Sequence, residues 1–254
     1  MIPRRSGEEI AMIDRACRVV RRVLGELSEL AVPGITTGEL DAHAEARCFE
    51  LGAKPAFKGY MGYPSSLCIS VNEEVVHGIP GRRRVEDGDL VSIDFGVRLE
   101  GYYGDSAITC EVGAVSAKEQ RLSRVTQECL HEAIAQVRPG RHVQDIGHAV
   151  ETHARQAGFS VVREFAGHGI GARLHEEPEI RNYGRRGRGP RIEKGMVFAI
   201  EPMITAGKAT IRILEDGWTA VTRDGSPAAH WELVAVATED GPRILGDPER
   251  PIEE

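Results

Sequence analysis

Apolar residues recur with a helical period in two pairs of segments, and each pair is followed by apolar runs typical of strands. In the first pair, a capping box at residues 6–9 starts a helix that ends before Pro33-Gly34. A second helix is predicted from Thr36 or Thr37 to Gly52. The segment that follows, to about residue 109, predicts strands over the runs LCISV, LVSIDFGV and SAITCEV.

The same order of elements returns in the second half of the chain. A capping box at residues 116–119 starts a helix to about Val137, Pro139-Gly140 breaks it, and another helix runs to Gly158. Later apolar runs predict strands at residues 197–200, 210–214, 219–222 and 232–237. We therefore expect an α+β fold in which one curved antiparallel sheet is flanked by helix pairs.

Matching positions in the two halves indicate an internal duplication. Pro33-Gly34 recurs 106 residues later as Pro139-Gly140, and Gly52 recurs as Gly158 at the same offset. Several such matches in one order favour two related halves over chance. The chain is then expected to be a single domain, 1–254, with pseudo-symmetric halves of about 1–112 and 113–254.

Four acidic residues accompany the apolar strands of the two halves. The segment GDLVSID, which ends on Asp94, aligns with GMVFAIE, which ends on Glu201, at an offset of 107 residues. Asp105 and Glu232 form the next pair, at an offset of 127. A twofold axis between the halves would bring the four carboxylates together. Because clustered buried carboxylates repel one another, we expect divalent cations to compensate them.

Three histidines lie in glycine-rich or turn contexts. His168 lies in AGHGIG, His175 in LHEEP, and His77 in VHGIP at a predicted strand-to-turn junction. One histidine with four carboxylates is an oxygen-rich set that suits Mn, Fe(II), Co or Zn, and bridging carboxylates can hold two ions about 3.5–4 Å apart. Each of these acids and histidines, taken alone, is more typical of a strand edge, the core or the surface than of a metal site. The prediction of a metal site therefore rests on their combination. The other six histidines lack such a context, and four of them, on predicted helices, are expected to be structural or solvated: His43, His131, His148 and His153.

Composition narrows the class of protein. Hydrophobic residues make up 41% and charged residues 28%, as in globular proteins, and the net charge of −7 argues against bulk binding to DNA or acidic membranes. There is no membrane-span-like apolar run and no secretory signal at the N-terminus. Five scattered cysteines without a CxxC motif predict reduced thiols in a cytoplasmic protein. The arginine-rich segment 181–191 is expected to be a solvated loop, with contact to an acidic partner such as RNA as the alternative.

Seven ordered motifs, spread over nearly the whole chain, resemble those of the type I methionine aminopeptidases. They are NEEVVHGIP (72–80), SIDFG (92–96), GDSA (104–107), GHGIG (167–171), HEEP (175–178), IEP (200–202) and Glu232. The resemblance is to the short bacterial form. It implies the pita-bread fold of creatinases and aminopeptidases, with a dinuclear metal site.

The resemblance also implies the activity and the metal ligands. The expected enzyme removes the N-terminal methionine from nascent proteins and peptides when the next residue is small, using a water activated by two divalent ions. By this likeness Asp94 binds one ion, Asp105 and Glu232 bridge both, and His168 and Glu201 complete the other.

Catalytic and pocket residues follow from the same resemblance. His175 is expected to stabilise the developing oxyanion or to hold the substrate carbonyl. His77 is expected to contact the peptide nitrogen after the scissile bond, and Glu201 to shuttle a proton. Phe57 stands where a cysteine is often seen, and Leu174 where an aromatic residue is common, which leaves the shape of the methionine pocket open. The positions that match the family's pocket are Tyr60, Tyr63, Cys68 and Trp218.

Partners and rival functions complete the expectation. The expected binding partner is the N-terminal methionine of nascent chains, and the ribosome surface is a candidate partner. No contact with DNA or membranes is expected. A monomer is the default expectation for the oligomeric state. One alternative is an X-Pro dipeptidase or aminopeptidase P of the same fold, although those relatives usually carry an additional N-terminal domain. The other is a catalytically inactive module that binds peptide, protein or RNA, although such relatives typically lose metal ligands.

Overall fold

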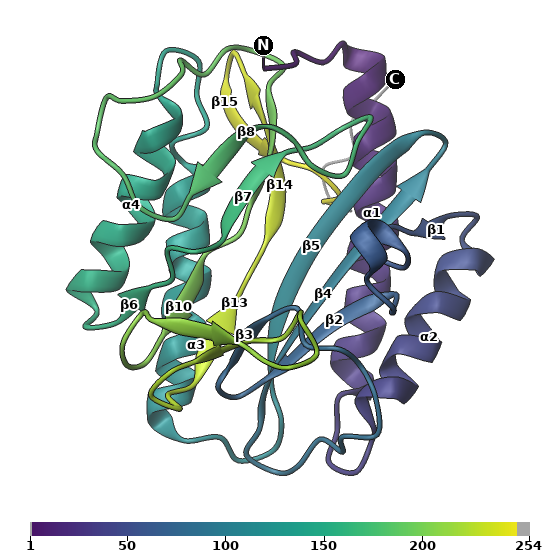
Figure 1. Cartoon of the computed structure of the whole chain (residues 1–254). Helices are drawn as coiled ribbons and strands as arrows, with labels where there is room; N and C mark the ends of the chain where they lie inside the picture. Colours follow the sequence, from purple (N-terminus) through teal and green to yellow (C-terminus); the bar gives the residue numbers. More distant parts are fainter. Residues whose placement is uncertain (1, 248–254) are drawn as a thin grey trace.

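Four helices form two pairs, one on each flank of the strands, in a computed structural model that describes residues 2–247 (Figure 1). The pairs lie where the apolar periodicity predicts them, to within a few residues. The helices are α1 (Gly7–Leu30), α2 (Thr37–Glu50), α3 (Ala117–Ile134) and α4 (Val143–Gln156), with a short 3-10 turn, η1, at Tyr60–Gly62.

Capping boxes start the first helix of each pair, as predicted. The Ser6 hydroxyl accepts the N–H of Glu9, and the Glu9 carboxylate accepts the N–H of Ser6. Ser116 and Glu119 make the same two bonds at the start of α3. Each box satisfies N–H groups that the helix itself leaves without partners.

The strands pair antiparallel throughout the described residues, in four hydrogen-bonded sheets. One larger sheet has the strand order β1-β4-β2, with β5 also paired to β4. The other larger sheet has the order β15-β14-β9-β7-β8. The two small sheets have the orders β13-β10-β6 and β11-β12-β3. The strands are β1 (Lys54–Pro55), β2 (Leu67–Val71), β3 (Glu74–Val76), β4 (Leu90–Leu99), β5 (Tyr102–Glu111), β6 (Ser160–Val161), β7 (Ala166–Gly169), β8 (Glu176–Arg181), β9 (Val197–Ile200), β10 (Met203–Thr205), β11 (Ile211–Ile213), β12 (Ala220–Thr222), β13 (Ala228–His230), β14 (Leu233–Thr238) and β15 (Gly241–Ile244).

One antiparallel bridge, Ala107 to Glu232, joins the two larger sheets at the centre of the molecule. The Glu232 N–H donates to the Ala107 carbonyl at 2.9 Å, and the Ala107 N–H donates back at 3.3 Å. The expected α+β, antiparallel architecture is confirmed, with hydrogen bonding divided among four sheets rather than continuous through one. The order helix, helix, strands occurs twice along the chain, while the interpretation as a duplication stays a prediction.

The β4–β5 hairpin corrects the predicted start of a strand at Ser106, since β5 begins at Tyr102. Glu100 and Gly101 have φ of +48° and +94°, the left-handed pair that a two-residue hairpin loop requires. Gly104 marks a close approach rather than a turn, because a Cβ there would lie 2.5 Å from the backbone nitrogen of Cys17 in α1. Asp105 therefore lies inside a strand that α1 covers.

Six strands in the second half were not predicted: the short strands β6, β10, β13 and β15, and β7 and β8 beside the centre. Glycines make up half of β7, and β8 has polar residues at alternate positions, so neither has the apolar run that signals a strand. Arg181 is the last residue of β8, and most of the segment after it is exposed, as expected for a loop; Asn182 is an exception, with only 2% of its surface exposed. None of the described helices is long and apolar enough to cross a bilayer.

Candidate metal centre

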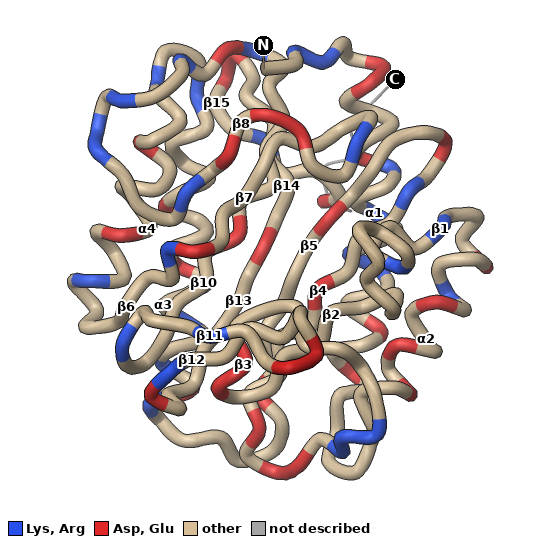
Figure 2. The backbone as a smooth tube through the Cα atoms, viewed as in Figure 1, with Lys and Arg blue, Asp and Glu red and all other residues tan. Residues whose placement is uncertain are grey.

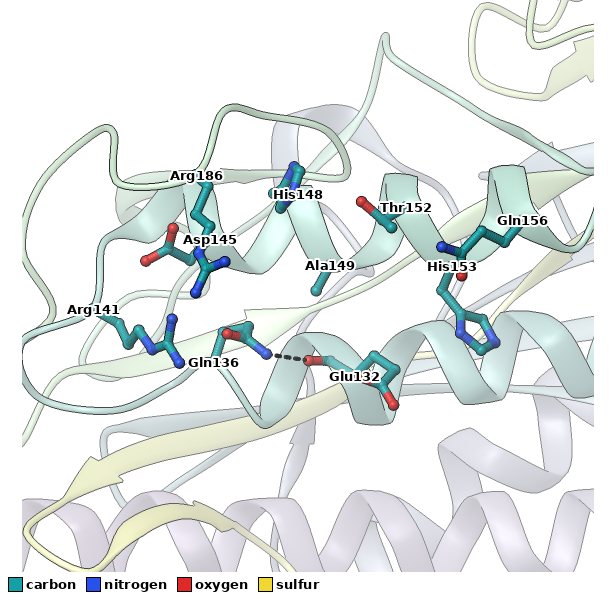
Figure 3. A pocket seen from close by; sticks show the side chains of 10 residues that line it. All are labelled: Glu132, Gln136, Arg141, Asp145, His148, Ala149, Thr152, His153, Gln156 and Arg186. Atoms are coloured by element: carbon teal, nitrogen blue, oxygen red, sulfur yellow. Dashed lines mark hydrogen bonds between the residues drawn. The ribbon is translucent and has the colours of Figure 1, made fainter.

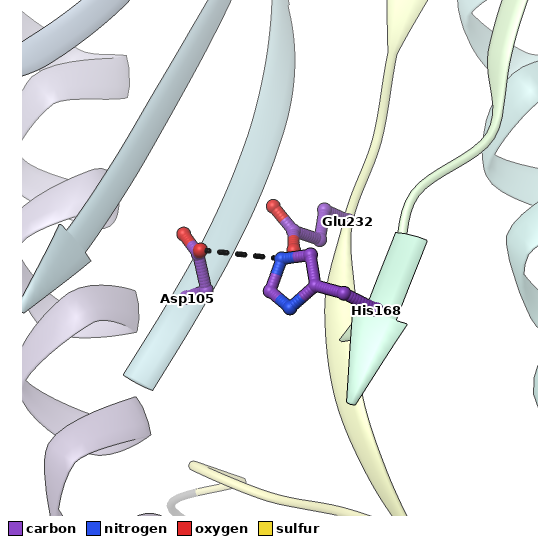
Figure 4. Close-up of side chains that lie close together, drawn as sticks. All are labelled: Asp105, His168 and Glu232. Carbon is purple, nitrogen blue, oxygen red and sulfur yellow. Dashed lines mark ion pairs between the residues drawn. The ribbon is translucent and has the colours of Figure 1, made fainter. Parts of the chain in front are cut away.

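The acidic residues of the two halves converge where the larger sheets meet. Asp94 on β4 and Asp105 on β5 come from paired strands of one sheet. Glu201 follows β9, and Glu232 lies between β13 and β14, at the bridge to Ala107. Ligand atoms of Asp105, His168 and Glu232 all lie within 4.8 Å of one another (Figure 4). The predicted convergence of side chains from both halves is therefore present in the fold.

His168 directs its ring nitrogen Nε2 toward this group of carboxylates. Its Nδ1 lies 2.9 Å from the Gly169 carbonyl oxygen, which is an acceptor, so Nδ1 carries the proton and Nε2 is free to bind a metal. Nε2 lies 3.9 Å from Oδ2 of Asp105 and 3.7 Å from Oε1 of Glu201. The tautomer that this backbone contact selects is the one a metal ligand needs.

The glycines beside His168 are required by backbone packing. A Cβ at Gly167 would lie 2.4 Å from the Ala199 carbonyl oxygen, and one at Gly169 would lie 2.2 Å from that of Glu177. Such distances leave no room for any side chain. The glycines let β7 lie directly against its neighbours, which sets the position of the imidazole.

Burial and mutual repulsion act on all four carboxylates. Burial raises the pKa of Asp105 to about 7. Burial, and then repulsion by neighbouring carboxylates that include Asp105, hold the pKa of Asp94, Glu201 and Glu232 well above their usual range. Buried oxygens of Asp94, Asp105 and Glu232 have no hydrogen-bond partner. Clustered acceptors without donors fit divalent cations, which would supply the missing positive charge.

An apolar cavity of about 170 Å³ opens onto these acids. Its wall contains a cluster of Phe57, Tyr63, Cys68 and Leu174, with Trp218 packed against it. The Tyr63 hydroxyl donates to backbone carbonyl oxygens at 3.0 Å, and its ring meets the Trp218 ring edge-on at 5.0 Å between centroids. The tyrosine is thus fixed as part of the wall rather than free to donate to a ligand.

Two further histidines line the same cavity. His175 contacts the Tyr60 hydroxyl through Nδ1 at 2.8 Å, and its ring lies perpendicular to that of His168 at 4.2 Å between centroids. His77 has φ of +63° and packs against the rings of Phe165 and Trp218. Burial lowers the pKa of both, with further lowering by His175 that brings His77 to about 4. Both imidazoles are neutral near pH 7.

Comparison with known proteins identifies a metallopeptidase family that has this combination of fold and residues. The model of metallopeptidase family M24 matches residues 11–238. The chain belongs to family M24. Methionine aminopeptidase 1 of Bacillus subtilis is 46% identical to this M24 chain, covering 96% of it and 99% of the relative, and that of Mycobacterium tuberculosis is 45% identical, covering 96% and 95%. The resemblance to methionine aminopeptidases is confirmed.

Solved structures of the M24 family agree with the fold. The methionine aminopeptidase of Thermotoga maritima superposes with a TM-score of 0.95 at 43% identity, covering 97% of this chain and 100% of that one. The prolidase of Pyrococcus furiosus superposes with a TM-score of 0.79 at 25% identity, covering 97% of this chain but 66% of that one. The pita-bread fold is therefore shared with both groups, and the likeness to the aminopeptidases is greater. As a member of M24 the chain is a metallopeptidase, for which a divalent metal is implied.

All eleven residues that the sequence analysis selected lie at or beside this cavity, and one neighbour was missed. The cavity lining contains Tyr60, Tyr63, Cys68, His77, Asp94, Asp105, His168, His175, Glu201, Trp218 and Glu232. His230, one of the six histidines to which the sequence analysis gave no site context, lies with Nε2 3.8 Å from Oε2 of Glu201. Its place two residues before Glu232, on the same side of an extended segment, was the signal that could have found it.

Proposed function

We propose that the chain is a metalloaminopeptidase that removes the N-terminal methionine from peptides and nascent proteins when the next residue is small. One observation carries the proposal: a small apolar cavity ends on a buried group of carboxylates and a histidine. At about 170 Å³ the cavity is smaller than the roughly 300–1,000 Å³ of sites for drug-sized ligands, which suits a single side chain. A methionine side chain is flexible and polarisable, as the mixed aromatic and sulfur lining favours.

The proposed ligands of two divalent ions are Asp94, Asp105, His168, Glu201 and Glu232, with Asp105 and Glu232 shared between the ions. The partnerless carboxylate oxygens and the free Nε2 of His168 support this set. Oxygen and imidazole donors suit Co, Mn, Fe or Zn. When bound, two such ions would lower the pKa of a water molecule and polarise the scissile carbonyl.

Neutral imidazoles beside the cavity are suited to donate hydrogen bonds to substrate. The contact with the Tyr60 hydroxyl holds the ring of His175, which is positioned to stabilise an oxyanion on the substrate carbonyl. His77 is proposed to contact the peptide nitrogen after the scissile bond, and its packing between Phe165 and Trp218 fixes that ring. Glu201 is the proposed proton shuttle, since burial and repulsion from Asp105 raise the pKa of its carboxyl and so favour uptake of a proton.

A metal-dependent assay on short peptides tests the proposal against both rival functions. The expected result is release of methionine from Met-Ala-Ser, loss of that activity after complete chelation, recovery on adding Mn²⁺ or Co²⁺, and little hydrolysis of an X-Pro peptide. Faster cleavage of the X-Pro peptide would favour an X-Pro peptidase. Absence of turnover with metal bound would favour an inactive binding module.

The ribosome surface is proposed as a partner, on the strength of an arginine face. We define this face as Arg141, Arg185, Arg186, Arg188 and Arg191; Arg141 interacts electrostatically with Asp145, and four of the five are exposed. Arg141 and Arg186 line a polar hollow of about 450 Å³ between α3 and α4 (Figure 3), and Arg185 and Arg188 line a second hollow beside α4. Figure 2 shows blue Lys and Arg positions along the backbone in this part of the molecule. This local cluster of arginines suits the phosphate backbone of ribosomal RNA, in contrast to the net charge of −7 of the whole chain.

Co-sedimentation with ribosomes tests this partner. Changing Arg185, Arg186 and Arg188 to Glu should weaken binding at least about tenfold and reduce its salt dependence, with tripeptide hydrolysis unchanged. The matched control changes Arg15, Arg21 and Arg22 on α1 to Glu. Equal binding by both triple variants would reject the arginine face. Action in the cytoplasm is part of the same proposal, supported by five free cysteines.

A further inference from the structure

His230 is a buried histidine to which the proposed mechanism gives no role. Only 2% of its surface is exposed, and its Nε2 has no hydrogen-bond partner. A buried polar atom without a partner normally costs free energy, so its presence calls for a physical reason. That reason lies in the group that Nε2 faces.

The backbone around His230 is held firmly. Its N–H donates to the hydroxyl oxygen of Thr109 at 3.1 Å, and the same hydroxyl donates to its carbonyl oxygen at 2.7 Å. On the other side, β13 pairs with β10 so that His230 lies opposite Met203, two residues after Glu201. These contacts direct the imidazole toward the Glu201 carboxylate.

Each oxygen of Glu201 faces a different imidazole. Oε1 lies 3.7 Å from Nε2 of His168, and Oε2 lies 3.8 Å from Nε2 of His230. The backbone of Glu201 is also held, because the Asn182 side-chain amide donates to its carbonyl oxygen at 2.9 Å. A second contact at the carboxylate would fix the remaining side-chain torsions.

We propose that His230 is a positioning residue whose Nε2–H donates a hydrogen bond to Oε2 of Glu201 and keeps Oε1 directed at the metal centre. A gap of 3.8 Å leaves no room for an intervening water, which needs two hydrogen bonds in series. A movement of about 0.8 Å, within the reach of a side-chain rotation, brings the two atoms to hydrogen-bond distance. The inference rests on the proposed role of Glu201 as a metal ligand.

Metal affinity of two variants tests the proposal. His230→Leu keeps a side chain of similar bulk but removes the donor, and His230→Gln keeps an N–H donor. Titration of the chelated proteins with Mn²⁺ should show a loss of about 10- to 100-fold for the leucine variant, as for other outer partners of metal ligands. The glutamine variant should stay within about threefold of wild type. Unchanged affinity of the leucine variant, or an equal loss in both variants, would overturn the role.

A second measurement keeps the proposal testable should the leucine variant fail to fold. Nitrogen-15 NMR of the histidine rings in the wild-type protein reports which ring nitrogen carries the proton. Nε2–H is expected for His230, and an Nδ1–H tautomer would refute the donor. Glu201→Gln separates this inference from the proposed function. If Glu201→Gln binds Mn²⁺ like wild type, the proposed centre fails. If it loses Mn²⁺ while His230→Leu does not, only the role of His230 fails.

Discussion

The two halves of the chain place their candidate ligands in different ways. In the first half, Asp94 and Asp105 lie on β4 and β5, whose ten-residue ladder is closed by a two-residue loop. In the second half, His168, Glu201 and Glu232 come from three separate places between residues 168 and 232. One local hairpin sets the first pair, whereas the second set depends on contacts between segments far apart in sequence.

This difference predicts which substitutions in each half disturb the candidate metal centre. The hairpin carboxylates hold their places through a ladder of backbone hydrogen bonds, so substituting one changes mainly charge and coordination. The second-half residues depend on close backbone approaches at glycines, so a change that does not touch a ligand can still displace one. The predictions below test this contrast.

Asp105→Ala is expected to have the largest effect. It removes a proposed bridging ligand, so turnover of Met-Ala-Ser should fall at least about a hundredfold, since even outer partners of metal ligands cost 10- to 100-fold. The metal-free protein should not be destabilised, because one repelling buried carboxylate is gone. The assay is paired with thermal unfolding after chelation, and Asp240→Ala at an exposed position is the control. Near-normal turnover with verified metal content would contradict the bridging role.

The next effect is a loss of stability of the chelated protein as pH rises. When the pKa of a carboxyl is higher in the folded chain than in the unfolded chain, the folded chain keeps the proton over a range of pH in which the unfolded chain has lost it. The free energy of unfolding therefore falls as pH rises from the unfolded pKa through the folded pKa. For Asp105 that window runs from about 4 to about 7, and the raised pKa values of the other three carboxyls act in the same direction. Within its window Asp105 contributes about 1.4 kcal/mol per pH unit.

Buried histidines oppose this trend below about pH 6.5. Their folded pKa is lowered, to about 3 for His168 and His230, so protonation of the unfolded chain removes stability as pH falls. Only the carboxyl effect remains above that pH. Thermal unfolding of chelated protein should therefore show a midpoint that falls as pH rises from about 6.5 through about 7, and saturating Mn²⁺ should abolish the slope. A midpoint that rises over this range without metal would contradict the assignment.

A smaller effect is expected from alanine at the close-approach glycines, one in each half. Gly104→Ala places a Cβ 2.5 Å from the Cys17 nitrogen, and Gly167→Ala places one 2.4 Å from the Ala199 oxygen. Both should lower the free energy of unfolding by about 1–3 kcal/mol. Only Gly167→Ala should also weaken Mn²⁺ binding strongly, because it moves the strand that carries His168. Gly25→Ala in α1, with no atom within 4 Å, is the control. Equal losses of metal affinity in both variants would remove the contrast between the halves.

Sequence reasoning located the strongly patterned elements and the candidate ligands, and failed where structure depends on distant contacts. The capping boxes and the apolar run at β2 and β9 carry their own local signals. In contrast, β7 is a strand because its glycines lie against the Ala199 and Glu177 carbonyls, which no local pattern encodes. His230 was missed because its neighbour Glu201 lies 29 residues earlier in the sequence, and its local signal, the place two residues before Glu232, was not used.

The finest test compares the apolar walls that each half contributes to the cavity. The Phe57 ring occupies the space above Gly96, where a Cβ would lie 2.6 Å from Cε1, and Leu174 of the second half is buried in the same apolar cluster. Phe57→Ala should enlarge the cavity, raise KM for Met-Ala-Ser severalfold, and narrow the preference for Met-Ala-Ser over Phe-Ala-Ser. Leu174→Ala removes fewer atoms and should change that preference less, because one methylene is worth about 0.8 kcal/mol. The ratio of kcat/KM for the two peptides is the measurement. If Leu174→Ala changed the ratio of kcat/KM more than Phe57→Ala does, then Leu174 of the second half, rather than Phe57 of the first, would limit the size of the substrate side chain that the cavity accepts.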